Sequence, residues 1–264
     1  MTPAVYFIFA VISFGASIIG AICGIGGGII IKPVLDAAGV LSVSTISFLS
    51  GCTVLAMTGY SVLRGKLSGN AQLDTKTATP LAVGAALGGI AGKEIFERIS
   101  AIFAAPDTVG AVQAFCLMLI TLGTLLYTLK KEKIRTRQLA GALICAAVGF
   151  LLGLVSSFLG IGGGPINLVV LFYFFSMDTK RAAQNSLYII LFSQAASLLS
   201  TILTGTVPEF PMPLLLLMIA CGIGGGICGR AINKKIDAET VDKLFIGLMA
   251  VIILINIYNI VRFL

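Results

Sequence analysis

The chain has 264 residues, of which 58% are hydrophobic and only 11% are charged. Its mean hydropathy is +1.06, well above what a soluble domain needs in order to build a core. The formal net charge of +7 does not indicate a nucleic-acid partner, because Lys and Arg lie in short loops beside apolar runs rather than on one soluble face. The composition therefore excludes an ordinary soluble domain and indicates a chain embedded in a lipid bilayer.

Ten apolar segments follow one another along the chain, five in each half. Most of them are about 20 residues long, the length that a helix needs to cross about 30 Å of hydrocarbon. The sequence therefore predicts an all-α, polytopic integral membrane protein. The expected segments are residues 4–23, 29–38, 42–63, 78–96 and 109–129 in the first half, and 139–159, 165–175, 182–203, 211–231 and 241–261 in the second.

The first segment has no features of a removable signal peptide. Residues 1–14 contain no Lys or Arg, and no A-x-A-like cleavage site follows them, so we expect this segment to stay in the mature protein. The six cysteines lie inside apolar stretches without a C-x-x-C pair, and the chain contains no His. We therefore expect the cysteines to serve packing, and we expect no bound metal and no cofactor.

An internal repeat organises the chain. The run Gly24-Ile-Gly-Gly-Gly28 recurs as Gly160-Ile-Gly-Gly-Gly164, and at the same offset of 136 residues Ser50 falls on Ser186. A glycine-rich run in each fourth segment repeats at an offset of 137 residues. These matches predict one transmembrane domain over residues 1–264, with repeat 1 at 1–129, a charged linker at 130–137 and repeat 2 at 138–264.

The glycines of the two fourth segments recur at four-residue spacing. This spacing is typical of helices that pack closely through small residues, and we expect packing rather than ligand binding there. The positions are Gly84, Gly88 and Gly92 in the first half, and Gly222, Gly225, Gly226 and Gly229 in the second.

The distribution of Lys and Arg distinguishes two topologies. If the first two segments of each half form a hairpin that returns to its starting side, three further crossings follow and the second repeat is inverted. With the N-terminus outside, this arrangement places 14 Lys and Arg residues in the cytoplasm and three outside, with Lys32 within the membrane. A parallel arrangement splits the same residues almost evenly, so the positive-inside rule favours inversion. We therefore expect both termini outside and residues 130–137 in the cytoplasm.

The short second segments indicate where a ligand binds. Each follows a Gly-rich interruption, and inversion brings the two interruptions together near the midplane of the bilayer. Backbone that leaves helical geometry inside a membrane is tolerated only where protein or a water-filled cavity receives its polar groups. A helix that begins there, with Pro165 in its first turn, directs free N–H groups at the cavity. Two such ends would suit a small, multiply charged oxyanion.

Uncharged side chains near the interruptions are candidate hydrogen-bond donors to that anion. They are Asn167, three residues past Gly164, together with Ser50, Ser186, Gln184 and Asn185 in the segments that follow. The alternative is that Ser and Asn in membrane helices bond to backbone carbonyls or to neighbouring helices. We further expect alanine at Gly27 or Gly163 to weaken binding, because the added Cβ meets a chain that needs positive φ.

Lys32 lies one turn into the first short helix and has no charged counterpart at Leu168. A cation within the membrane is a functional candidate, here as a direct substrate contact. The alternatives are an ion pair with Asp36 at i, i+4 and extension of the side chain towards an interface. Asp36 and Asp178 are candidates for a coupling proton, but both lie near segment ends where we expect solvent to satisfy them. No acidic residue lies in the middle of a long segment.

The order of these motifs resembles that of the TauE/SafE-type transporters, also called the TSUP family. The resemblance rests on the two Gly-x-Gly-Gly-Gly runs, the proline after each, the serine about 22 positions later and the glycine-rich fourth segment. It covers nearly the whole chain and implies transport of sulfite, sulfonates or related sulfur-containing anions across the prokaryotic cytoplasmic membrane. The positions that match are Gly24, Gly26, Gly27 and Gly28, Gly160, Gly162, Gly163 and Gly164, and Ser50 and Ser186. Lys32 departs from the pattern.

These observations predict a secondary transporter for a small sulfur-containing anion that works by alternating access, with a proton or a cation as its coupling ion. An anion channel of the same architecture is the alternative. A membrane-embedded enzyme does not fit, because the chain lacks His, paired buried carboxylates and a nucleophile with a base beside it.

Overall fold

The computed structural model describes residues 2–68, 73–102, 106–161 and 163–263. Within these residues the chain forms ten α-helices, one short 3₁₀ helix and no strand, so the predicted all-α fold is confirmed. The helices are α1 (Pro3–Cys23), α2 (Gly28–Ala38), α3 (Val43–Leu67), α4 (Thr75–Ile102) and α5 (Pro106–Lys130) in the first half, the 3₁₀ helix η1 (Lys131–Lys133) in the linker, and α6 (Ala142–Phe158), α7 (Pro165–Phe175), α8 (Thr179–Leu203), α9 (Met212–Asn233) and α10 (Ala238–Phe263) in the second half.

Six helical stretches in the described part of the chain are long and apolar enough to cross a membrane. They are α1, α3, α8, α9, α10 and the stretch Thr108–Lys133. Helix α4 is not among them although it has 28 residues. The apolar helices α6 and α7 are shorter, with 17 and 11 residues.

The short second helix of each half begins where the sequence predicts it. Helix α1 ends at Cys23, with Gly24 in the left-handed conformation at its C-cap, and α2 begins four residues later at Gly28. Helix α7 begins at Pro165, which occupies the first helical position, where a proline loses no hydrogen bond. Each half therefore contains a broken helix pair around its Gly-rich run.

The sixth helix differs from the prediction at its start. We expected helix from residue 139, but α6 begins at Ala142. The N–H groups of Arg137 and Leu139 instead donate to the carbonyls of Tyr173 and Phe174 at the end of α7, at 2.7 and 2.8 Å. These bonds hold the preceding residues outside the helix.

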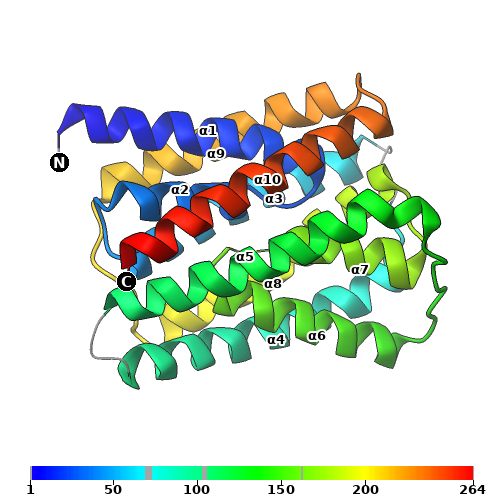
Figure 1. Cartoon of the computed structure of the whole chain (residues 1–264), viewed down its shortest axis with the longest axis horizontal. Coiled ribbons are helices and arrows are strands. Elements are labelled where there is room, and N and C mark those ends of the chain that lie inside the picture. Colours follow the sequence, from blue (N-terminus) through cyan, green and yellow to red (C-terminus); the bar gives the residue numbers. More distant parts are fainter. Residues whose placement is uncertain (1, 69–72, 103–105, 162, 264) are drawn as a thin grey trace.

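The helices form two groups that lie one above the other in Figure 1. One group contains α1, α2 and α3 with α9 and α10, and the other contains α6, α7 and α8 with α4 and α5. Helix α4 packs along α6 and α8, just as α9 packs along α1 and α3, while α5 contacts α7 and α10 contacts α2. The last two helices of each half therefore pack against the first three helices of the other half. This correspondence supports the two-repeat organisation, which stays a prediction.

Glycines allow the closest of these helix contacts. At Gly84, Gly88 and Gly92 a Cβ would overlap backbone atoms of α6, and at Gly225 and Gly229 it would overlap the backbone of α1. Gly222 and Gly226 lie against Thr53 and Met57 of α3. The predicted packing through small residues is confirmed.

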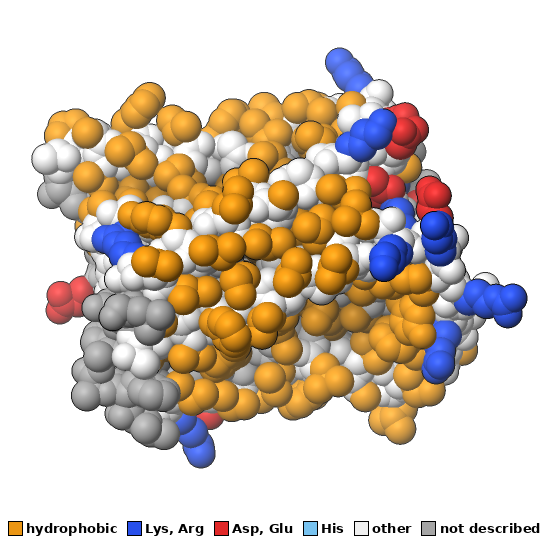
Figure 2. All heavy atoms as spheres, viewed as in Figure 1, with side chains coloured by type: hydrophobic (Ala, Val, Ile, Leu, Met, Phe, Trp, Pro, Cys, Tyr) orange, Lys and Arg blue, Asp and Glu red, His pale blue; other side chains and the backbone are white. Residues whose placement is uncertain are grey.

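Both termini lie at one end of the helix bundle, and the linker lies at the opposite end (Figure 1). On the face that Figure 2 shows, hydrophobic side chains cover most of the surface between the two ends, whereas charged side chains gather towards the ends. An apolar waist between polar ends is the surface that a bilayer requires. Which end faces the cytoplasm, and whether the repeats are inverted, stay predictions.

Candidate functional site

The two Gly-rich loops contain several residues in the left-handed region. Gly24, Gly26, Gly160 and Gly163 have φ values of +76°, +69°, +66° and +144°, which residues with a Cβ rarely adopt. The prediction of positive φ is therefore right at Gly163. It is wrong at Gly27, where φ is −69° because this residue already has helical geometry as the N-cap of α2.

The loops contact the opposite half of the chain through their backbones. A Cβ on Gly28 would overlap the carbonyl group of Ile161, and a Cβ on Gly24 would overlap the backbone of Ala183 in α8. This close approach is a structural reason for glycine at both positions. The loops do lie together as predicted, while direct contact of their glycines with a ligand stays a prediction. Gly162 lies outside the described residues.

The polar residues that the sequence singles out lie in different surroundings. Ser50, Ser186 and Asn167 are buried, and Ser50 Oγ, Ser186 Oγ and Asn167 Oδ1 have no hydrogen-bond partner. Asn185 accepts from the N–H of Asp74 at 3.2 Å and donates to the carbonyl of Arg181 at 2.7 Å. It therefore joins α8 to the start of α4, and its neighbour Gln184 is only half-buried.

The structure contains a pocket that the sequence did not reveal. It lies between helices of both halves, next to the second Gly-rich loop, and encloses about 380 Å³ including its open mouth. Its lining combines apolar rings with several hydroxyl and amide groups. The lining residues are Ser47 and Phe48 of α3, Lys93 and Phe96 of α4, Gln113 of α5, Ser157 and Gly160 at the end of α6, and Gln194, Ser197, Leu198 and Thr201 of α8.

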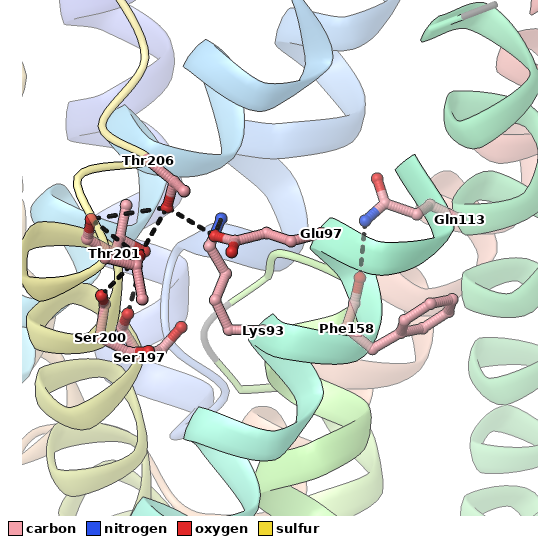
Figure 3. A network of polar contacts seen from close by, with 9 residues as sticks. Lys93, Glu97, Gln113, Phe158, Ser197, Ser200, Thr201 and Thr206 are labelled. Carbon is pink, nitrogen blue, oxygen red and sulfur yellow. Dashed lines mark hydrogen bonds and ion pairs between the residues drawn. The ribbon is translucent and has the colours of Figure 1, made fainter. Parts of the chain in front are cut away.

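Four polar atoms in this lining are buried without a hydrogen-bond partner. They are the hydroxyl oxygens of Ser47 and Ser157 and the side-chain carbonyl oxygens of Gln113 and Gln194. A buried polar group left unpaired costs about 1–3 kcal/mol. Such groups are expected to bind water or a ligand. One donor is already used, because Gln113 Nε2 donates to the carbonyl of Phe158 at 2.6 Å (Figure 3).

Lys93 supplies the positive charge of the pocket. Its side chain is only 15% exposed, and its Nζ lies 3.5 Å from Glu97 Oε1 and 5.1 Å from the centre of the Phe96 ring. Thr206, in the α8–α9 loop, donates to the same Glu97 oxygen at 2.6 Å (Figure 3). The ion pair is therefore a long one, and Glu97 has a second partner in Thr206.

The repeat counterpart of Lys93 is engaged differently. Arg230 donates to the carbonyl of Ser61 at 2.6 Å and to Ser68 Oγ at 3.0 Å. In the sequence, Lys93 was one of the three Lys and Arg residues expected outside the membrane, and it was not a candidate for the site. The signal that could have found it is its place at position 93 inside the predicted segment 78–96.

Lys32 pairs with Asp36, one of the alternatives that the sequence offered. Lys32 Nζ donates to Asp36 Oδ2 at 2.7 Å, with both side chains buried. The pair lines a second, smaller pocket of about 190 Å³, whose other lining residues are Pro33, Gln113, Ala114, Leu117, Leu159 and Asn256. Substrate contact by Lys32 stays a prediction.

The two pockets adjoin at Gly160. A Cβ on Gly160 would lie 2.6 Å from Ser47 Oγ and 3.1 Å from Lys32 Cε, and Gln113 lines both pockets. The missing side chain at Gly160 therefore leaves room for the Lys32 methylenes beside the first pocket.

Comparison with known proteins agrees with this architecture. Residues 9–255 match the protein family described as "Sulfite exporter TauE/SafE". The chain is also 24% identical over 263 residues to the "Probable membrane transporter protein YunE" of Bacillus subtilis (strain 168), covering 89% of this chain and 91% of that protein. No solved structure matches the chain. Since the family match covers nearly the entire sequence, the chain belongs to the TauE/SafE sulfite exporter family of membrane transporters.

Proposed function

We propose that this chain is a secondary transporter that carries a small sulfur-containing anion across the cell membrane by alternating access. The anion binds in the pocket between α3, α4, α6 and α8. The observation that carries this assignment is the combination of a nearly buried lysine with unpartnered hydroxyl and amide groups in one pocket.

The chemistry of the lining suits an oxyanion. Lys93 provides a charged donor, the hydroxyls of Ser47 and Ser157 can each donate once, and the Gln194 amide can donate twice. Hydrogen bonds from these groups replace those that water gives to an anion such as sulfite or a sulfonate. Family membership supports a sulfur-containing substrate, and the pocket supports its negative charge and small size.

The contact between the Gly-rich loops supports movement by alternating access. The loops belong to the two different helix groups and touch near the pocket, so a change in the angle between the groups would alter access from each side. In this arrangement Gly160 both lines the pocket and belongs to the loop that contacts the first half. The positive-inside distribution of Lys and Arg supports an orientation with both termini outside.

Uptake into proteoliposomes tests this function. Purified protein is assayed with sulfite, sulfate, thiosulfate and methanesulfonate, and we expect saturable uptake of at least one of them. Lys93→Met should lower its kcat/KM at least tenfold. Arg98→Met is the matched control, because Arg98 lies on the same helix and pairs with Glu94 at 2.8 Å but is 76% exposed.

Three results would contradict the proposal. Equal uptake by wild type and Lys93→Met would show that the anion does not bind in this pocket. Uptake of none of the four anions would contradict the assignment of a small sulfur-containing anion as the substrate. An anion conductance far above the turnover of a carrier would show a channel instead.

A further inference from the structure

Asp36 has a buried carboxylate with one oxygen that makes no hydrogen bond. The residue is 6% exposed, Oδ2 accepts from Lys32 at 2.7 Å, and Oδ1 has no hydrogen-bond partner. We expected solvent to satisfy Asp36 near the end of its segment, and its burial shows that this expectation was wrong. A buried carboxylate with one unpaired oxygen is poorly stabilised in its charged form.

The charged groups around Asp36 are few. Helix α10 contributes Arg262, whose guanidinium donates to the backbone carbonyls of Asp36 and Ala37. Helix α10 also contributes Asn259, which donates to the carbonyl of Pro33 at 2.9 Å. The other helices against α2 are α1, which has no charged residue, and α3, whose charged residues lie in its last turn. Among the described side chains, Lys32 therefore provides the direct charge partner of the carboxylate.

The protonated form of Asp36 has a hydrogen-bond acceptor available. Protonation converts a carboxylate oxygen from an acceptor to a donor. Gln113 lines the same pocket, and its Oε1 is buried without a partner. Two oxygens that are unpaired in the ionised state can thus bond to each other, directly or through a water, once Asp36 takes up a proton.

The partner of Asp36 is also close to the proposed anion site. The Lys32 methylenes run beside Gly160, and Gly160 lines the first pocket together with Ser47. An ammonium group on a flexible four-carbon stem can therefore turn from Asp36 towards the first pocket. While Asp36 is ionised it holds this ammonium group in the second pocket.

We propose that Asp36 is the proton-binding group of coupled transport in this protein, and that its protonation releases Lys32 to pair with the anion in the first pocket. A proton from water adds to a carboxylate oxygen of Asp36, Lys32 keeps its own proton, and the ion pair between them is replaced by one between Lys32 and the anion. Proton and anion then bind together and cross together, which makes the protein a proton–anion symporter. This inference rests on the proposed function for the binding of the anion, whereas the binding of a proton by Asp36 does not depend on that function.

Infrared spectroscopy of purified protein tests the proton site without any ligand. Acidification of wild type should produce the carbonyl stretch of a buried protonated carboxyl group, and Asp36→Asn should lack that band. Asp178→Asn is the matched control, because Asp178 is exposed at the N-cap of α8 and asparagine also serves as an N-cap. In Lys32→Met the band should persist to higher pH, since loss of the cation favours the neutral acid.

The same band in Asp36→Asn as in wild type would overturn the proposal. If Asp36→Asn does not fold, a band in Lys32→Met at the same pH as in wild type would overturn it instead.

A transport assay tests the coupling. Methanesulfonate stays ionised across the whole range of pH used and brings no proton of its own. In proteoliposomes that contain a pH-sensitive dye, wild type should acidify the lumen during methanesulfonate uptake. Asp36→Asn should exchange methanesulfonate across the membrane without moving protons, while Lys32→Met should lose both activities. Proton movement by Asp36→Asn equal to that of wild type would contradict the inference.

The failure of the proposed function is a separate result. If wild type moves no anion, the proposed function fails while the infrared titration still decides whether Asp36 binds a proton. If anion exchange and its proton coupling both survive in Asp36→Asn, the function stands and the inference fails.

Discussion

Gly28 lies so close to the backbone carbonyl of Ile161 that a Cβ on Gly28 would overlap the carbonyl oxygen. The two residues belong to the Gly-rich loops of the two halves, which are 136 residues apart in the sequence. The loops therefore meet backbone to backbone, without side chains between them. A movement of one helix group against the other would change this contact.

The first prediction concerns this contact. Gly28→Ala should force the loops apart and destabilise the protein by about 1–3 kcal/mol, the usual cost of excess volume in a packed core. Gly164→Ala is the repeat-related control. Gly164 has φ of −176°, an extended conformation open to any residue, and its Cβ would meet only the flexible Ile161 Cδ1 at 3.1 Å.

Thermal unfolding in detergent measures both variants. We expect a lower Tm for Gly28→Ala and a Tm close to that of wild type for Gly164→Ala. If Gly164→Ala lost as much stability as Gly28→Ala, the backbone contact at Ile161 would not explain the requirement for glycine.

The fold could be predicted because its signals are local. A run of apolar residues between charged loops gives a membrane helix irrespective of what it packs against, and the Gly-rich runs before positions 28 and 165 interrupt helices through backbone chemistry alone. The start of α6 could not be predicted, because it depends on bonds from Arg137 and Leu139 to the distant end of α7. No pattern around residue 139 indicates those partners.

The site could be predicted only in part. The loops were found by their repetition, and their proximity followed from the charge distribution. The first pocket was missed because Ser47, Lys93, Ser157 and Gln194 come from four separate helices. Their convergence depends on the packing of α4, from the first half, against α6 and α8 of the second half. The order of the segments in the sequence does not reveal this packing.

The second prediction tests whether an unpartnered hydroxyl in the first pocket serves the ligand. Ser157→Ala removes a buried oxygen that has no partner, so the stability should change by less than about 0.5 kcal/mol or increase. The affinity for the transported anion should nevertheless fall several-fold, which appears as a higher KM in proteoliposome uptake. Ser13→Ala is the control, because Ser13 Oγ is also buried and unpartnered but lies on α1 rather than in the pocket lining. A raised KM in both variants would mean that the effect is not local to the pocket.

The third prediction concerns the contact between α4 and α6. Gly88→Ala places a Cβ onto the backbone of Phe150, so the two helices must separate and the Tm should fall. Gly123→Ala is the control on α5, because no atom lies within 4 Å of its added Cβ. Alanine favours a helix over glycine by about 1 kcal/mol, so Gly123→Ala should keep or raise the Tm. A stable Gly88→Ala protein with unchanged transport would show that the helices can separate at no cost.

The last prediction concerns orientation. Both termini lie at the end of the bundle opposite the linker (Figure 1), so labelling of one end fixes the other. The linker holds Lys130, Lys131, Lys133, Arg135 and Arg137 within eight residues, and short loops with this excess of positive charge stay in the cytoplasm. The termini should therefore face outwards.

Single cysteines test this orientation in a variant whose six native cysteines are replaced. Intact cells are treated with a membrane-impermeant maleimide, which should label Thr2→Cys, and Lys133→Cys should react only after the cells are opened. The cysteine-free variant gives the background, and its transport activity confirms that the fold is retained. Labelling of position 133 in intact cells, with position 2 protected, would reverse the orientation. Labelling of both positions from one side would contradict the arrangement of the helices themselves, because an odd number of crossings must separate the N-terminus from the linker.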